Sequence, residues 1–327
     1  MYSFISTRDI SELHNAYKAL YGQDLDKKWN KHVVLCPDLA GAMLSGMTAK
    51  KLLTAEFRVL VNVYFHYKNY VNGMTEARRD AVNAAAQAVF TYKSYSTKIA
   101  QFLLNPDNKY EIHNCIYCDM EKISSFDHKR KKVRRFETEH VLDKGDCPLV
   151  ALSLHNFVPA CGHCNGPSVK GVRTIGDTIE EIKHLSPTNP SYDFWHKVLF
   201  VVNPITDAIT DIKREDHPDH YEIDFRYKYT SYSKFTELFG LKSRYQEDCL
   251  KKALQLLDKK DRFTPKMLSD LANLYKKTPE EVYEDEFRVE TDRREHEIYR
   301  REHEIYRREH EIYRKMKEDL MGLTELK

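Results

Sequence analysis

Two pairs of cysteines constrain this chain more than any other feature of its sequence. Cys115-Ile-Tyr-Cys118 and Cys161-Gly-His-Cys164 each place two thiols three positions apart. Thiolates at this spacing on a tight turn take two corners of a tetrahedron, so two such pairs complete a closed structural Zn²⁺ site. The 42 residues between the pairs, 119–160, exceed the roughly 15 to 20 of a simple zinc ribbon. The sequence therefore predicts a zinc-held unit that encloses a sizeable segment.

Length and composition place the chain among folded proteins without a membrane span. Its 327 residues favour two or three compact units, and a hydrophobic content of 41% is too high for wholesale disorder. The best apolar stretch begins at Phe57 and stops at His66, which is too short to cross a bilayer. The first residues lack the basic and apolar regions of a secretion signal. We expect a cytoplasmic protein, in which seven cysteines favour metal binding over disulfides.

Periodicity and composition divide the chain into four segments and predict an α+β fold. The segments are an N-terminal helical region, a cysteine-rich core, an α+β extension and a charged helix, at 1–108, 109–175, 176–277 and 278–327.

Local patterns support this division. Apolar residues recur at three- and four-residue spacing between Leu52 and Phe65, and NPDN at 105–108 breaks the helical pattern. Strict alternation over 221–229 predicts a strand with one wet face, and leucines around 250–257 predict a helix. Thr264-Pro265 has the pattern of a capped helix start.

The last segment has an unusual repeat. After a capping box at Thr278-Pro-Glu-Glu281, the sequence RREHEIY occurs three times in succession from Arg293. Each copy offers only adjacent Ile and Tyr as apolar residues, which specifies a coiled coil poorly, whereas its Glu and Arg spacing supports a single solvated helix. We expect a continuous charged helix to about Met321, dispensable for chemistry and available for assembly or partner binding.

Between the cysteine pairs lies a set of side chains suited to phosphodiester hydrolysis. The segments FETEHVLDK and LHNFVPACGHCNGPSVK contain Glu139-His140, Asn156 and Asn165. Together with CIYC they resemble the HNH (ββα-metal) endonuclease superfamily, in the variant whose fold is held by zinc on four cysteines. The spacings fit, since Asn156 lies 16 positions after His140 and Asn165 lies 9 positions after Asn156. The resemblance covers about 60 of the 327 residues.

The resemblance implies a zinc-pinned ββα-metal core and a role for each residue. His140 falls on the general base, while Glu139 and Asn165 fall on the ligands of a catalytic divalent ion. Asn156 falls on the middle Asn, which supports the loop or the base through hydrogen bonds. Glu139 replaces the commoner Asp, which changes reach more than chemistry. The structural zinc would be held by Cys115, Cys118, Cys161 and Cys164.

Elementary chemistry agrees with these roles. Phosphodiester hydrolysis needs an activated water, a cation at the scissile phosphate and help for the leaving oxygen. A neutral His140 can take the proton of the water near pH 7. Carboxylate and amide oxygens are hard ligands suited to Mg²⁺ or Mn²⁺, which keep waters and bind substrate phosphate. The zinc takes no part in hydrolysis in this scheme.

A basic run precedes the Glu-His pair. Because the net charge of the chain is only +2, a polyanion has to be bound by a local patch such as this one. We expect phosphate contacts here, with a solvated loop as the alternative, and a further contact from Lys170. The basic residues of the run are Lys129, Arg130, Lys131, Lys132, Arg134 and Arg135.

The sequence thus predicts an HNH endonuclease that hydrolyses nucleic acid, with DNA as the favoured substrate. By analogy with stand-alone HNH proteins of bacterial or phage defence and mobile-element systems, we expect a partner such as an ATPase, or self-assembly through the C-terminal helix. The alternative is a zinc-dependent nucleic-acid-binding or assembly module without catalysis. Such a module has no need of the Glu-His, Asn and Asn set, which favours the enzyme.

Overall fold

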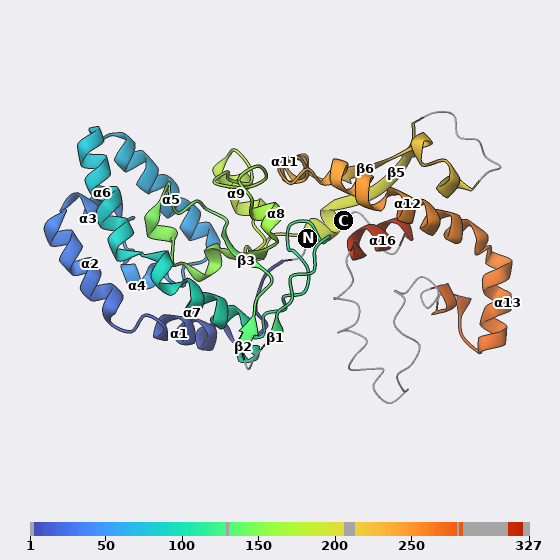
Figure 1. The fold of residues 1–327 in the computed structure, drawn as a ribbon, viewed down its shortest axis with the longest axis horizontal. Helices are drawn as coiled ribbons and strands as arrows, with labels where there is room; N and C mark the ends of the chain where they lie inside the picture. Colours follow the sequence, from blue (N-terminus) through green and yellow to red (C-terminus); the bar gives the residue numbers. More distant parts are fainter. Residues whose placement is uncertain (1–2, 129–130, 206–212, 280, 284–312, 323–327) are drawn as a thin grey trace. The chain divides into compact units, whose positions relative to one another are not determined.

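Two compact units make up the chain, Met1–Asp193 (unit 1) and Phe194–Lys327 (unit 2). The computed structural model describes residues 3–128, 131–205, 213–279, 281–283 and 313–322, without the side chains of 127–128 and 131–132. Each unit combines helices with small antiparallel sheets, so the fold is α+β, as predicted (Figure 1). The four segments inferred from composition are a finer division than these two units and stay a prediction.

Helices form the first half of unit 1, and their apolar faces build its core. In α5, Leu60, Val61 and Tyr64 are buried, as their spacing predicts. The predicted periodicity is interrupted at 53–56, where the chain leaves α4 before α5 begins. The elements are α1 (Ile10–Ala19), α2 (Asp24–Leu35), α3 (Asp38–Ala42), α4 (Ala49–Leu52), α5 (Phe57–Asn72), α6 (Glu76–Val89), α7 (Tyr92–Leu104) and η1 (Pro106–Asn108).

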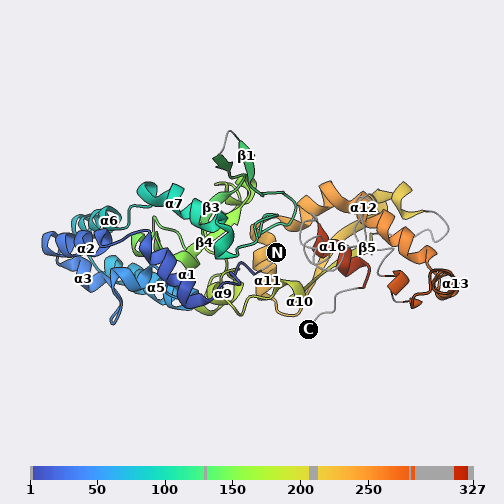
Figure 2. The same ribbon diagram turned by 90° about the horizontal axis from the view of Figure 1, so that it is seen from below.

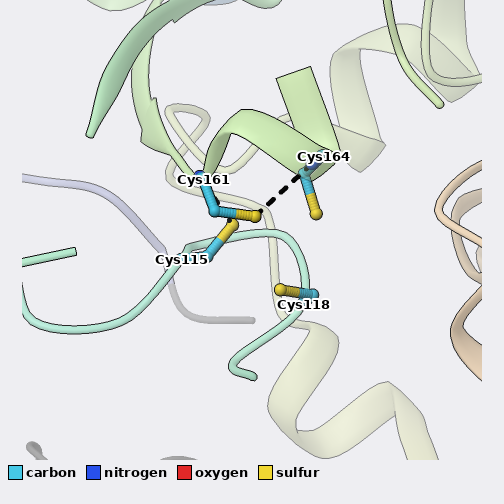
Figure 3. A group of neighbouring side chains, drawn as sticks. All are labelled: Cys115, Cys118, Cys161 and Cys164. Atoms are coloured by element: carbon cyan, nitrogen blue, oxygen red, sulfur yellow. Dashed lines mark hydrogen bonds between the residues drawn. The ribbon is translucent and has the colours of Figure 1, made fainter. Parts of the chain in front are cut away.

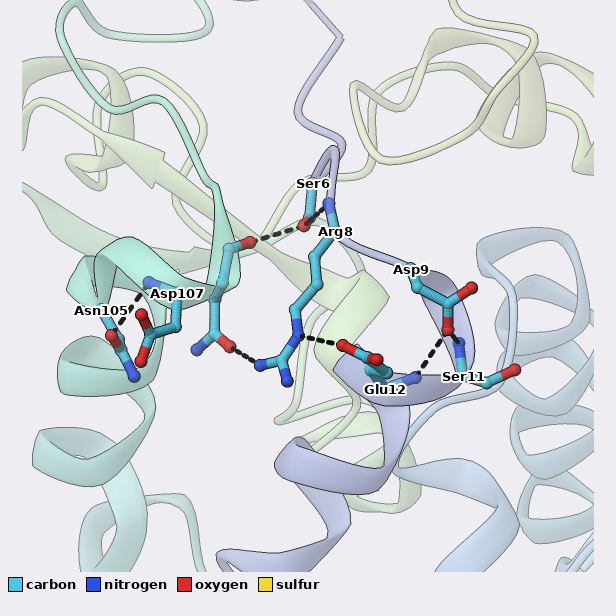
Figure 4. A network of polar contacts seen from close by, with 8 residues as sticks. Ser6, Arg8, Asp9, Ser11, Glu12, Asn105 and Asp107 are labelled. Carbon is cyan, nitrogen blue, oxygen red and sulfur yellow. Dashed lines mark hydrogen bonds and ion pairs between the residues drawn. The ribbon is translucent and has the colours of Figure 1, made fainter.

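Polar side chains join the start of the chain to the end of α7. Ser6 Oγ donates to the Asn108 carbonyl at 2.5 Å, and Arg8 Nη1 donates to Asn108 Oδ1 at 2.8 Å (Figure 4). The buried Asn108 amide also donates to the Phe102 carbonyl at 2.7 Å. Asp9 caps α1 by accepting from two backbone amides of its first turn. These bonds fix α1 relative to α7, the helix that approaches the candidate site.

Two antiparallel hairpins dominate the second half of unit 1. In the second hairpin, Glu139 is opposite Val158 and His140 is opposite Phe157. This hairpin leads directly into a short helix, which gives the order β3, β4, α8, and Figure 2 shows the two strands side by side with α7 close to β3. The elements are β1 (Phe126–His128), β2 (Lys131–Val133), β3 (Glu137–His140), η2 (Pro148–Val150), η3 (Leu154–Asn156), β4 (Phe157–Ala160), α8 (Gly162–Asn165) and α9 (Ile179–Leu185).

Unit 2 is built on one long antiparallel hairpin. Its strand β6 buries Tyr221, Ile223 and Phe225 in strict alternation, which confirms the strand predicted there. The predicted cap is also confirmed, since Thr264 Oγ1 accepts from the Met267 amide at the start of α13. The described elements before residue 283 are α10 (Phe194–Lys197), β5 (Val198–Pro204), η4 (Arg214–Asp216), η5 (Pro218–His220), β6 (Tyr221–Tyr227), α11 (Ser231–Leu238), α12 (Leu241–Arg262) and α13 (Pro265–Tyr275).

The last described helix, α16 (Arg314–Leu320), is part of the core of unit 2. It packs on β5 and α12, and Asp319 Oδ2 accepts from the Phe200 amide at 2.8 Å. Lys315 and Asp319 form a fully buried ion pair. Removal of α16 would therefore expose the covered face of β5, and the expectation that the segment after Asp292 is dispensable for chemistry stays a prediction.

The predicted continuous helix also differs from the structure at its C-terminal end. Tyr313 has a φ of +62°, a left-handed conformation that an α-helix does not contain, and α16 begins only at Arg314. At the other end the predicted capping box is present, because the Thr278 and Glu281 side chains each accept from the other's backbone amide. The repeats between these points, up to residue 312, lie outside the described residues.

Candidate functional site

The four paired cysteines come together in one cluster. Their Sγ atoms all lie within 4.8 Å of one another, and all four residues are buried (Figure 3). Among the described residues this is the one group of three or more His, Cys, Asp or Glu side chains arranged to hold a metal ion. The members are Cys115, Cys118, Cys161 and Cys164.

Local backbone geometry presents these thiols as ligands. The Cys161 amide donates to Cys115 Sγ at 3.3 Å, and the Cys164 amide donates to Cys161 Sγ at 3.4 Å, which caps α8. Burial, followed by neighbouring thiols, raises the pKa of Cys115. Four buried thiols this close together lose their protons only when a cation between them balances the negative charge. Four thiolates are the ligand set of a closed tetrahedral zinc site. The donor set therefore fits a structural metal such as zinc.

The cluster joins the β3–β4–α8 unit to a separate turn. Cys161 follows β4 and Cys164 lies in α8, while Cys115 and Cys118 lie on a turn closed by an Asp119 to Cys115 backbone bond of 2.9 Å. A metal on the four sulfurs would therefore tie the end of the hairpin to a segment more than 40 residues away in the sequence.

Asn156 braces the loop that follows β3. Its Oδ1 accepts from the Leu142 amide at 2.8 Å, and its Nδ2 donates to the carbonyls of Leu142 and Val150 at 3.0 and 3.1 Å. The side chain is fully buried, and its backbone carbonyl also accepts from the Val141 amide. The amide group thus closes the loop directly after His140, which is the kind of support that the resemblance implies for this position.

His140 lies at the end of β3 as a neutral ring. Its Nε2 is 3.1 Å from the Ala151 carbonyl oxygen, which only accepts, so Nε2 carries the proton and the lone pair is on Nδ1. Burial, followed by the charge of Lys144, lowers the pKa of His140 to about 3. The rings of Tyr92 and Phe157 pack edge-on against it, with centroids at 4.5 and 4.9 Å. At neutral pH the ring can take a proton only at Nδ1.

Glu139 points to the other side of β3 and is fully engaged there. Its Oε1 lies 2.6 Å from Lys170 Nζ, and its Oε2 accepts from the Tyr117 hydroxyl at 2.5 Å. Lys170 Nζ also donates to the His140 carbonyl at 2.9 Å, and the Lys170 side chain has no exposed surface. A lysine enclosed in this way cannot contact nucleic acid at the surface, so the expected phosphate contact by Lys170 is corrected to a buried ion pair.

Asn165 does not share a site with Glu139. Its Nδ2 donates to a carboxylate oxygen of Glu137. Glu137 is exposed and lies on β3, two positions before Glu139. Because both oxygens of Glu139 are occupied and Asn165 is bonded elsewhere, these two side chains do not fit a shared divalent ion as they are arranged.

The basic run leads from the first hairpin toward β3. Arg134 and Arg135 are exposed, and Arg134 Nη1 donates to Thr138 Oγ1 at 3.0 Å. Arg135 lies over the exposed ring of Phe126, 4.9 Å from its centroid. Lys131 and Lys132 are in β2, where only the backbone is described, and Lys129 and Arg130 lie outside the described residues.

Three residues that contact this region were missed at the level of sequence. Tyr117 carries no signal beyond its place between two cysteines, and Tyr92 is 48 positions before His140. Lys144 follows His140 by four positions, which is the one local hint that sequence reasoning could have used. His155, the residue before Asn156, pairs with His14 at 3.1 Å between their Nε2 atoms.

Comparison with models of protein families, with curated proteins and with solved structures finds no match to this chain. Of the helices that the structure describes, none is long and apolar enough to cross a membrane.

Proposed function

We propose that the chain is an HNH-type endonuclease that hydrolyses phosphodiester bonds of nucleic acid, with DNA as the favoured substrate. The observation that carries the proposal is His140, a buried neutral imidazole at the end of β3 whose Nε2 proton is fixed by Ala151. It stands on two antiparallel strands followed by a helix, next to a four-cysteine cluster suited to zinc. This order of elements agrees with the ββα core that the motif residues imply.

In the proposed reaction His140 accepts the proton of the attacking water at Nδ1. The Ala151 carbonyl then stabilises the Nε2–H side of the imidazolium that forms, while Asn156 keeps the intervening loop in place. Packing of Tyr92 and Phe157 against the ring limits its rotation. A ring held in one tautomer and one orientation needs little reorganisation when the proton moves.

The Mg²⁺ or Mn²⁺ that the resemblance implies stays a prediction. Glu139 and Asn165 have the right oxygen donors, but their present partners, Lys170 and Glu137, would have to release them first. The role in bacterial defence or mobile elements and an ATPase or self-assembly partner likewise rest on analogy with stand-alone HNH proteins. The cytoplasmic location stays a prediction from the sequence, which lacks a secretion signal pattern in its first residues.

Plasmid nicking and cutting with Mg²⁺ or Mn²⁺ test the proposal. We expect cleavage by the wild type and a loss of at least 100-fold in His140→Ala, because removing a general base costs about 10²–10⁴ in rate. His163→Ala is the matched control, since this histidine is exposed and lies between two cysteines of the cluster. Zinc content must be equal in all three proteins. Cleavage by His140→Ala at the wild-type rate would rule out the assignment.

One observation favours the alternative, a zinc-stabilised nucleic-acid-binding module without catalysis. Glu139 is buried in an ion pair with Lys170, as a structural carboxylate would be. Salt-dependent binding of nucleic acid by the wild type, with no cleavage of single- or double-stranded DNA or of RNA in either metal, would decide for the module.

A further inference from the structure

Tyr92 brings two exposed cations together beside His140. It is the first residue of α7, and its hydroxyl is 3.5 Å from the Thr138 carbonyl of β3. Lys144 Nζ lies 5.5 Å from the centroid of the Tyr92 ring. The rings of Tyr92 and His140 are nearly perpendicular, with centroids 4.5 Å apart, so a residue from the N-terminal helices packs directly against the proposed base.

Arg134 lies near the same tyrosine. Its guanidinium donates to Thr138 Oγ1 and lies over the Phe136 ring at 5.9 Å. Its charge acts to lower the pKa of Tyr92, against burial, which is the larger cause and raises it. Thr138 and His140 alternate with Glu137 and Glu139 along β3 and so share one face of the strand. Arg134, through Thr138, and Lys144, through Tyr92, therefore both lie near the face of β3 that carries His140.

The charges of this group are not balanced by close acidic partners. Among the residues whose side chains the structure describes, neither Arg134 nor Lys144 takes part in an ion pair within 4.0 Å. The carboxylate of Glu137 is the nearby acid that influences Tyr92, and it accepts from Asn165. Lys144 also acts on His140 directly, as the second cause of its lowered pKa. Two cations held at one tyrosine repel each other unless an anion lies between them.

We propose that Arg134 and Lys144, placed around the Tyr92 ring, form a seat for one phosphate group of a nucleic-acid strand next to His140. Arg134 supplies a planar fork anchored by Thr138, and Lys144 supplies a compact charge held over an aromatic face. The inference rests on the proposed function for the identity of the ligand. It goes further by naming Arg134 and Lys144 as the residues that would bring the scissile phosphate to the base.

Binding and cleavage by matched charge variants test the seat. Fluorescence anisotropy of a labelled 20-base-pair duplex with the zinc-loaded protein, over a salt series without added Mg²⁺ or Mn²⁺, measures binding without a step that depends on a catalytic divalent ion. Lys144→Gln and Arg134→Gln should each reduce the slope of log K against log salt by about 1, as expected for one lost phosphate contact. Lys50→Gln, the same change on the exposed face of α4, should leave the slope unchanged.

Cleavage at saturating substrate separates this seat from a general basic surface. We expect Lys144→Gln to lower the turnover rate by about tenfold or more and Lys144→Arg to recover most of it, because a phosphate beside the base needs a charge there in the transition state. If the salt slopes of Lys144→Gln and Arg134→Gln equal the slope of Lys50→Gln, the inference is overturned. If the wild type binds with these slopes but cleaves nothing, the seat stands and the proposed hydrolysis fails.

Discussion

Replacement of Lys170 by Met tests the buried ion pair behind β3. The methionine side chain is similar in length but leaves the Glu139 carboxylate, which is 1% exposed, with the Tyr117 hydroxyl as its remaining bonded partner. Removing one member of a buried pair costs about 3–5 kcal/mol. The His140 carbonyl also loses its lysine donor, which is part of the same cost. Against a typical stability of about 5–15 kcal/mol, this is a large fraction of the free energy of unfolding.

Urea unfolding of the zinc-loaded protein measures this cost in unit 1 alone. The chain has two tryptophans, Trp29 in unit 1 and Trp195 in unit 2, so a Trp195→Phe background leaves a reporter for unit 1. The double variant Glu139→Gln with Lys170→Met removes both charges and keeps an acceptor for Tyr117. We expect it to recover at least half of the lost stability, since an uncompensated charge is the main penalty.

Lys183→Met supplies the control for this experiment. Lys183 pairs with Glu180 at 2.9 Å on the surface, where Glu180 is 84% exposed, so its loss should cost less than about 1 kcal/mol. A cost for Lys170→Met no larger than this control would refute the buried-pair reasoning.

The same variants also test whether Glu139 binds the divalent ion. If Glu139 is a ligand, its release from Lys170 in Lys170→Met should tighten Mn²⁺ binding measured by electron paramagnetic resonance.

Two further outcomes follow from the structure. Purified protein should carry about one zinc per chain by metal analysis. Cys115→Ser should lose this zinc and unfold the core of unit 1, because structural zinc contributes roughly 10 kcal/mol or more to folding. A wild type that is folded without zinc would contradict this. Burial, followed by the charge of His14, lowers the pKa of His155 from 6.5 to about 4. Between these pH values the unfolded state binds more protons than the folded state, so the free energy of unfolding should fall by up to roughly 3 kcal/mol as the pH drops from about 6.5 to about 4. Urea titrations at pH 4.5 and 7 should show a smaller loss in His155→Gln than in the wild type, and an equal loss would argue against the assignment.

Sequence patterns predicted what depends on local chemistry. The strand at 221–227 follows from alternation, and the starts at Thr264 and Thr278 follow from capping, because these signals lie within a few residues of each other. The four-cysteine cluster follows from two tight spacings. Strand β5 was missed because Val198-Leu-Phe-Val-Val202 is apolar at every position, a pattern that does not separate a strand from a buried helix.

The parts that could not be predicted depend on contacts between distant residues. Lys170 follows a metal-binding motif, and a lysine there is expected at the surface. Its side chain is buried instead, where it pairs with Glu139, whose carboxylate also accepts from Tyr117. Tyr92 reaches His140 only because α7 packs beside β3. The left-handed conformation of Tyr313 has no Gly or Pro to predict it, and α16, which begins directly after it, packs on β5. Burial of a polar group is a tertiary property that local spacing does not encode.

The position of α16 in unit 2 sets an order of events during synthesis. All of unit 1 lies before Asp193, whereas β5 is covered only when Leu320 has been made, 127 residues later (320 minus 193). At about 5–20 residues per second, unit 1 has roughly 6–25 s in which to fold and take up its metal before unit 2 can close. A ribosome that stops within the repeats would release a chain whose first unit is complete and whose second unit leaves one face of its hairpin uncovered.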